Sequence, residues 1–183
     1  MSLCTLSNVK DYLGIVGAKA TDDNVIEELI NNVSTEIETY INRSILSTET
    51  TEYNNGDKQL YFLSNTPITS ISGMWSSTNY TFNEDAIIDA ADYTNTEDAL
   101  IMKNYKTTAG NKTVKIVYTG GYTTTPLDLK QVCVEETGRK FKNRTSFDIT
   151  ARSTGDGNVT YVEKGFLKKN LLVMNKYKWI GLC

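Results

Sequence analysis

The sequence predicts an α+β protein: a small bundle of about four helices with an antiparallel β subdomain inserted between the second and third helices. Apolar residues recur with helical spacing before residue 46 and after residue 125. The stretch between is rich in Thr, Tyr, Val and Ile, with recurring turn signals, as short strands require. The predicted helical domain therefore comprises residues 1–46 and 119–183, and the predicted β subdomain comprises residues 47–118.

Two helices are predicted in the N-terminal part. The first covers residues 5–13 and stops at Gly14, a common helix terminator. The second covers about residues 22–43 and starts with two aspartates, which the helix dipole favours. Its apolar residues are spaced by three and four and form one stripe: Val25, Ile26, Leu29, Ile30, Val33, Ile37, Tyr40 and Ile41.

The inserted stretch is predicted to form short strands separated by turns. Turn-forming residues recur at 54–57, 64–67 and 109–112. Residues 86–93 fit either a short helix or a loop. The strand candidates are Glu49–Tyr53, Gln59–Leu63, Ile68–Trp75, Asp98–Tyr105 and Thr113–Tyr118.

The C-terminal part is predicted to contain the remaining helices. The third begins at Pro126 and ends near Asn143, because proline is favoured in a first helical turn. A loop rich in Ser, Thr and Gly follows over residues 145–160, with a small strand possible at 159–162. The last helix is expected within residues 166–180.

The formal charge of −3 conceals a strong asymmetry between the two halves of the chain. Residues 1–100 contain 4 Lys/Arg and 16 Asp/Glu, a charge of −12. Residues 101–183 contain 15 Lys/Arg and 6 Asp/Glu, a charge of +9. Such asymmetry fits a nucleic-acid surface, contact between copies, or two solvated faces. The overall charge argues against a dedicated DNA-binding domain, so protein contact is preferred.

The sequence predicts no enzyme, no cofactor and no metal site. Histidine is absent, so no serine or cysteine nucleophile has the commonest general base. The acidic residues between 84 and 98 lack the spacing of a calcium loop, and Gly155-x-Gly157 lacks the third glycine of a dinucleotide site. The three cysteines are expected to be free thiols. No apolar run is long enough for a membrane span, and no secretory signal is expected.

The order of these elements resembles the head–tail connector (adaptor) family of tailed bacteriophages. The resemblance covers nearly the whole chain, with residues 76–111 as an enlarged insert and 176–183 as an extra tail. It is carried by the segments Thr5–Ile15, Asp22–Arg43, Leu60–Ile71, Tyr118–Gln131 and Lys140–Arg144, together with the terminal helix.

The resemblance implies a structural virion protein that forms a ring beneath the portal, joins the DNA-filled head to the tail and lets DNA pass. The implied partners are further copies in a dodecameric ring, the portal protein, a tail or stopper protein, and DNA passing through the lumen without being read. The implied location is the virion neck, after assembly in the host cytoplasm. The alternative is a phage or bacterial binding module whose β subdomain recognises a glycan or a protein.

Two interaction surfaces are predicted for this role. The surface facing the portal or a neighbouring copy comprises Arg139, Lys140, Lys142, Arg144, Arg152, Phe166, Leu171, Lys176 and Trp179. The acidic surface facing a neighbour comprises Glu84, Asp85, Asp89, Asp92, Glu97 and Asp98.

Overall fold

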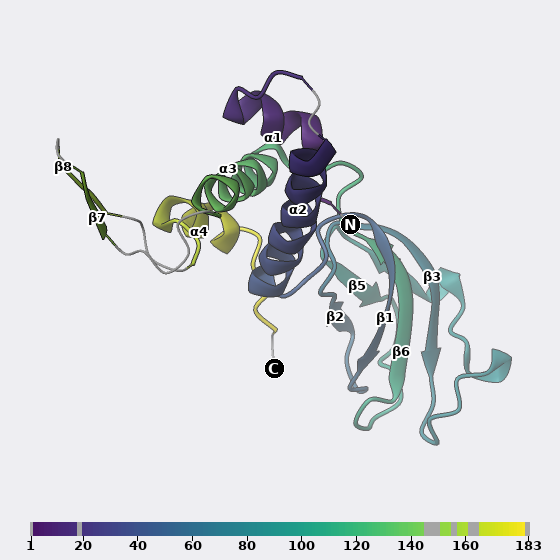
Figure 1. Cartoon of the computed structure of the whole chain (residues 1–183). Coiled ribbons are helices and arrows are strands. Elements are labelled where there is room, and N and C mark those ends of the chain that lie inside the picture. The colour runs from purple at the N-terminus through teal and green to yellow at the C-terminus, as the bar shows by residue number, and fades with distance from the viewer. Residues whose placement is uncertain (1, 18–19, 145–150, 155–156, 161–164, 182–183) are drawn as a thin grey trace. The chain divides into compact units, whose positions relative to one another are not determined.

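The computed structural model describes residues 2–17, 20–144, 151–154, 157–160 and 165–181 (Figure 1). Within these ranges the chain forms four α-helices, with antiparallel strands between the second and the third. The predicted α+β class with an inserted β region is therefore confirmed. The helices are α1 (Leu6–Leu13), α2 (Ala20–Ile41), α3 (Leu127–Asn143) and α4 (Lys168–Asn175). The strands are β1 (Thr48–Asn54), β2 (Leu60–Phe62), β3 (Ile68–Ser76), β4 (Tyr93–Asn95), β5 (Ala99–Met102), β6 (Val114–Gly120), β7 (Ala151–Thr154) and β8 (Gly157–Thr160).

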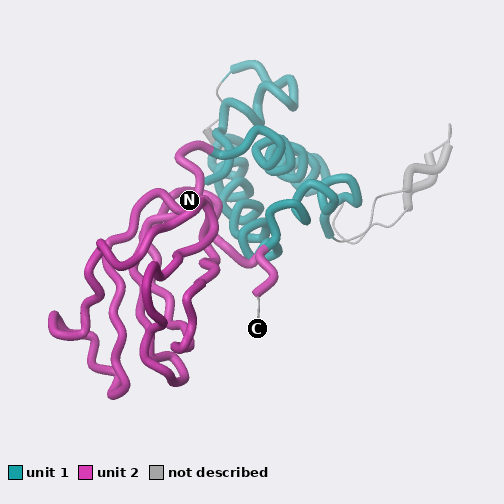
Figure 2. The backbone as a smooth tube through the Cα atoms, turned by 180° about the vertical axis from the view of Figure 1, so that it is seen from behind, with its two compact units in different colours: residues 1–41, 125–178 teal, residues 42–124, 179–183 magenta. Residues whose placement is uncertain are grey.

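The chain divides into two compact units (Figure 2). The helical unit contains residues 1–41 and 125–178, and the β unit contains residues 42–124 and 179–183. The helical unit is thus discontinuous in sequence, because the main part of the β unit is inserted between α2 and α3. The functional domains expected at 1–46 with 119–183 and at 47–118 stay a prediction.

The helical unit forms because α1 is capped at both ends and α2 carries a buried apolar stripe. Thr5 caps α1 by accepting a hydrogen bond from the Asn8 backbone N–H, and the Asn8 side chain accepts one from the Thr5 backbone N–H. Gly14 ends α1 with φ +68°, a conformation that favours glycine. Burial of each large apolar side chain contributes about 1.5–3 kcal/mol, so packing of α2 against α3 dominates over helix propensity. The buried stripe of α2 consists of Ile26, Ile30, Val33, Ile37 and Ile41.

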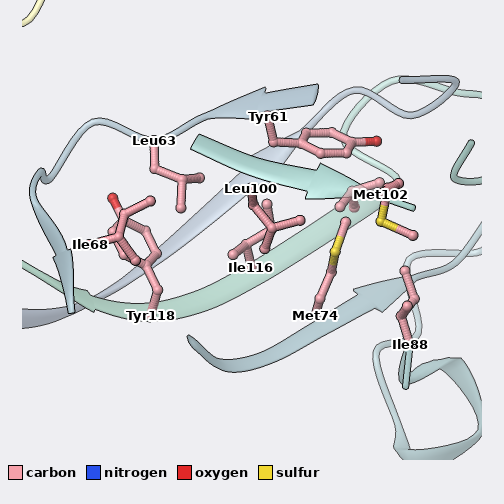
Figure 3. Close-up of a cluster of buried hydrophobic side chains, with 10 residues drawn as sticks. Tyr61, Leu63, Ile68, Met74, Ile88, Leu100, Met102, Ile116 and Tyr118 are labelled. Atoms are coloured by element: carbon pink, nitrogen blue, oxygen red, sulfur yellow. The ribbon is translucent and has the colours of Figure 1, made fainter. Parts of the chain in front are cut away.

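The β unit contains two three-stranded antiparallel sheets, ordered β1-β6-β3 and β2-β5-β4. Alternate residues of β6 point into the core, as its sequence pattern predicts. The sequence predicted either a short helix or a loop at residues 86–93. The structure has two 3-10 turns in this region, Glu84–Ala86 and Ala90–Asp92. Ile88 lies between these turns and enters the core (Figure 3). The other core residues are Tyr61, Leu63, Ile68, Met74, Leu100, Met102, Val114, Ile116 and Tyr118.

A polar network fixes the turn between β2 and β3 inside the β unit. Glu52 accepts hydrogen bonds from the Ser64 backbone N–H at 2.9 Å, the Ser64 hydroxyl at 2.6 Å and the Tyr118 hydroxyl. The Tyr118 oxygen accepts a hydrogen bond from the Asn65 N–H at 2.9 Å, and the Asn65 side-chain amide donates to the Gly120 carbonyl at 2.7 Å. The turn is therefore held against β1 and β6 by buried and half-buried polar groups.

The β unit's main segment begins and ends side by side. The Tyr122 N–H donates to the Ile45 carbonyl at 2.8 Å, and the Ser47 N–H donates to the Tyr122 carbonyl at 2.9 Å. Leu46 and Tyr122 form an isolated parallel bridge. These contacts close the insertion at its base within the β unit itself.

Candidate interaction surfaces

Three of the cations predicted to face a partner form ion pairs within the helical unit. The distances are 2.7 Å from Arg139 Nη2 to Glu136 Oε2 and 2.6 Å from Lys140 Nζ to Glu36 Oε1. Arg144 Nη2 lies 3.2 Å from Asp22 Oδ1. Glu36 and Asp22 belong to α2, so two of these pairs tie the C-terminal half of α3 to that helix.

Lys142 differs from its neighbours on α3. It is exposed and has no ion-pair partner among the described residues. Arg152 lies in β7, and its side chain falls outside the described part of the structure. Of the predicted basic residues on α3, Lys142 is therefore the one whose charge is unpaired within the described ranges.

Glu136 is a buried glutamate that the sequence patterns did not reveal, and its hydrogen bonds hold the start of α4. Glu136 has an exposed fraction of 0%. Its Oε1 accepts from the Leu167 N–H and from the Asn170 side-chain amide, both at 2.8 Å. Its Oε2 accepts from Arg139 Nε at 2.9 Å. Its spacing could have indicated that Glu136 is buried, since it lies three residues after Cys133 on the apolar face of α3.

α4 lies beside α3 (Figure 1). Its exposed side carries an apolar residue between two lysines. Lys168, Leu172 and Lys176 are four residues apart, are all exposed, and form what we call the α4 outer face. Leu172 is 69% exposed, whereas the predicted Leu171 is partly buried. Neither lysine has an ion-pair partner in the described ranges.

The two aromatic residues of the predicted basic surface occupy different surroundings. Phe166 packs edge-on against Tyr40, with ring centroids 6.3 Å apart. Trp179 is partly exposed and belongs to the short C-terminal segment of the β unit. Ile180 beside it is 75% exposed. Phe166 is thus used in packing within the helical unit, whereas the segment with Trp179 and Ile180 exposes apolar surface.

The predicted acidic residues form three local groups instead of one cluster. Glu84 and Asp85 are exposed in the first 3-10 turn. Asp89 and Asp92 precede β4, where Asp92 Oδ2 accepts from the Tyr105 hydroxyl at 3.2 Å. Glu97 and Asp98 are exposed in the turn after β4, at its opposite end. No three His, Cys, Asp or Glu residues in the described ranges lie close enough together to hold a metal ion.

An open groove lies between α1 and α3 in the helical unit. Its volume is about 360 Å³. Leu127 on its rim is 81% exposed, and Tyr12 is 52% exposed. The groove is lined by Asn8, Asp11, Tyr12, Leu127, Lys130, Gln131 and Val134.

Comparison with solved structures identifies the class of fold. The chain is similar to a chain of the neck of an empty gene transfer agent (GTA) particle, computed with C6 symmetry, and to one in the virion of the native particle. Both matches have a TM-score of 0.63 and 12% identity, and cover 97% of this chain and 90% of the other. A chain of the native neck computed with C12 symmetry matches with a TM-score of 0.58 and 11% identity at the same coverage. The fold is therefore one used by chains of GTA particles and their necks.

The sequence itself gives the family. The model of the family described as "HCP: Head completion protein" matches residues 2–179. The chain therefore belongs to the head completion protein family, and its recognition as a structural head–tail connector protein is confirmed. No curated protein matches the sequence. None of the described helices is sufficiently long and apolar to cross a membrane.

Proposed function

We propose that this protein assembles as a dodecameric ring in the neck of a virion, between the portal and a tail or stopper protein. DNA passes through the lumen without being read, and the protein catalyses no reaction. The family match over residues 2–179 carries this proposal. The C6 and C12 symmetries named for the similar neck structures favour a cyclic arrangement. Assembly in the host cytoplasm and residence in the virion neck belong to the same proposal.

A closed ring needs two different patches on each copy, because each subunit contacts one neighbour on each side. We assign the acidic groups of the β unit, at Glu84–Asp85 and Asp89–Asp92, to one side of this contact. The basic side includes Lys142 of the helical unit. Opposite charges favour the correct register and a faster encounter more than they raise the affinity.

We assign portal docking to the α4 outer face. Leu172 supplies an apolar anchor, and Lys168 and Lys176 supply positive charges on either side of it. Arg139, Lys140 and Arg144 support this face indirectly, through the ion pairs that hold α3 in place. The fitting partner is therefore an apolar portal surface rimmed by carboxylates.

The docking proposal is tested by replacing Leu172 with aspartate. Because Leu172 is exposed, we expect Leu172→Asp to fold normally by circular dichroism and to bind the cognate portal at least about tenfold more weakly, or about 1.4 kcal/mol. Leu127→Asp is the matched control, since it alters an exposed leucine on another surface of the same unit. Cryo-electron microscopy and native mass spectrometry with the portal provide the readout. Wild-type affinity for Leu172→Asp would exclude the α4 outer face.

The ring proposal is tested in the same assay. An isolated monomer alone does not contradict it, because rings of this kind can form on their template. A wild-type protein that stays monomeric with the portal at low and moderate salt does contradict it.

A row of side chains on the outer face of the first sheet favours a second candidate function. Tyr53, Lys115 and Trp75 are adjacent across β1, β6 and β3. Lys115 Nζ lies 4.8 Å from the Trp75 ring centroid, and Phe82 packs against Tyr53 at 5.7 Å. Such an aromatic row can bind a glycan or a protein. A glycan array and a deletion variant lacking the β insert separate the two functions, because loss of ring assembly on deletion favours the neck role.

A further inference from the structure

Two free cysteines from distant parts of the sequence meet inside the helical unit. Cys4, just before α1, and Cys133, in α3, are both buried. Their sulfur atoms lie 3.3 Å apart. The hydroxyl oxygen of Ser34, in α2, lies 3.6 Å from Cys133 Sγ. The thiol pair therefore occupies a buried position to which three segments of the unit contribute.

The segment that carries Cys4 is fixed in place on both sides of the thiol. The Leu3 N–H donates to Ser34 Oγ at 3.0 Å, and Leu3 itself is buried. The Ser34 hydroxyl in turn donates to the Ile30 carbonyl at 2.7 Å. On the other side, Thr5 caps α1. The two sulfur atoms are thus held together by the fold.

We propose that Cys4 and Cys133 are an oxidation site, at which a two-electron oxidant such as hydrogen peroxide converts the thiol pair into an intrachain disulfide. In the first step the Cys133 thiolate attacks peroxide, the O–O bond breaks, and Cys133 becomes a sulfenic acid while hydroxide leaves. In the second step the Cys4 sulfur attacks that sulfur, the S–S bond forms, and the S–OH oxygen leaves as water by taking the proton that the Cys4 thiol gives up. Two thiols and one peroxide give one disulfide and two waters.

The hydrogen bond between the two thiols distinguishes their roles. Cys4 donates to Cys133, and accepting this bond lowers the pKa of Cys133. The same bond raises the pKa of Cys4. The thiolate is the reactive form of cysteine, so Cys133 reacts first and Cys4 resolves the intermediate.

The disulfide would join the two halves of a discontinuous unit. Cys4 lies before α1, and Cys133 lies beyond the inserted β segment, so the closed loop contains α1, α2 and residues 42–124. Cross-linking distant residues stabilises a fold mainly by restricting its unfolded chain. The helical unit would then stay closed even when the insertion is strained or cleaved.

The conditions for oxidation differ between the cell and a released particle. The cytosol keeps thiols reduced, whereas the extracellular medium supplies oxidants. Under the proposed neck function, the disulfide therefore forms after release and not during assembly. The chemistry itself does not depend on that function and can be measured with the isolated chain.

The test uses full-length protein carrying Cys183→Ser, so that Cys4 and Cys133 are the remaining thiols. After treatment with hydrogen peroxide, we expect intact mass spectrometry to show loss of two hydrogen atoms, and peptide mapping to link Cys4 to Cys133. We expect Tm to rise by about 5–15 °C and to return on reduction. Cys4→Ser in the same background should show neither change.

Two results would overturn the proposal. One is a folded Cys183→Ser protein that keeps both thiols after prolonged oxidation. The other is a peroxide-induced rise in Tm of equal size in Cys4→Ser. Ring and portal assays are run with reduced protein, so a negative result here leaves the neck function untouched, and a failed assembly assay leaves the disulfide untouched.

Discussion

At the scale of single residues, Glu136 shows how one buried carboxylate can organise a surface helix. It receives three hydrogen bonds from side chains and backbone of α3, α4 and the residue before α4. A buried charge is tolerated only when it is paired and hydrogen-bonded, as it is here. The exposed α4 outer face therefore depends on a residue that is itself inaccessible.

Replacing Glu136 should loosen α4. We expect Glu136→Ala to reduce the free energy of unfolding by about 3 kcal/mol, because it leaves the Asn170 amide and the Leu167 N–H without an acceptor. Urea denaturation measures this loss, and hydrogen exchange should show faster exchange in residues 167–176. Glu135→Ala is the matched control, since its partner Lys169 is exposed and its loss should be smaller. Equal effects of the two substitutions would contradict the role given to Glu136.

Tyr118 should make the β unit sensitive to alkali. Burial, and then the hydrogen bond to Glu52, raise the pKa of Tyr118 above its ordinary value. Because the folded pKa exceeds the unfolded one, this stabilisation is complete below about pH 10 and is lost as the pH rises above it. Urea unfolding at a series of pH values should show stability falling above that point.

Tyr118→Phe should reduce the fall of the free energy of unfolding with rising pH above about pH 10. Near neutral pH it should lower that free energy by about 1–2 kcal/mol, because hydrogen bonds are lost. The slope should not vanish, because burial also raises the pKa of Tyr61. Tyr53→Phe, at an exposed position of the same sheet, is the control and should keep the wild-type slope. An unchanged slope in Tyr118→Phe would show that other groups cause it.

At the scale of elements, local patterns predicted most of the fold. The stripe of α2 and the alternation of β6 follow from spacing within one element, so a single sequence reveals them. The end of α1 at Gly14 and the start of α3 beside Pro126 were visible for the same reason. The three-residue strand β4 was missed, because it is too short to display an alternating pattern.

The candidate surfaces were harder to predict, because they depend on contacts between distant residues. Lys140 pairs with Glu36, which is 104 residues away, and Arg144 pairs with Asp22, which is 122 residues away. A cluster of cations on one helix therefore looks free in the sequence and is largely paired in the fold. Likewise, only packing decides that Leu172 is exposed while Leu171 is partly buried.

β6 should be sensitive to any side chain at Gly120. A Cβ there would lie 1.9 Å from the Asn65 carbonyl oxygen, so the turn after β2 would have to move. We expect Gly120→Ala to destabilise the protein by about 3 kcal/mol, through overpacking and loss of the Asn65 hydrogen bond. Thr119→Ala on the same strand is the control and should have a smaller effect. Urea denaturation compares the two, and wild-type stability in Gly120→Ala would refute the close approach.

At the scale of the whole molecule, the charge asymmetry of the sequence survives only in part. Two carboxylates of the acidic half, Glu36 and Asp22, form ion pairs with two cations of the basic half, Lys140 and Arg144, within the helical unit. The acidic groups of the β unit, Lys142 and the α4 outer face remain available for contacts between molecules. Ring assembly should therefore use fewer charges than the sequence alone indicates.

Assembly should nevertheless respond to salt and to these particular carboxylates. We expect the double substitution Glu84→Lys, Asp85→Lys to weaken assembly on the portal about tenfold at low salt, with the difference shrinking near 1 M salt. Glu27→Lys, Glu28→Lys changes the net charge equally on exposed positions of α2 and serves as the control. Sedimentation with the portal measures both. Equal weakening in the two variants would mean that net charge, not this site, governs assembly.

The hydrogen-bonded base of the insertion, where Ile45 and Ser47 meet Tyr122, has a consequence for how such proteins diversify. An inserted segment whose two ends are adjacent can be exchanged for another segment whose ends are equally close. The exchange does not require α2 or α3 to change. Recombination could therefore give one helical scaffold many different insertions, and protein engineers could graft an enzyme or an epitope at the same junction.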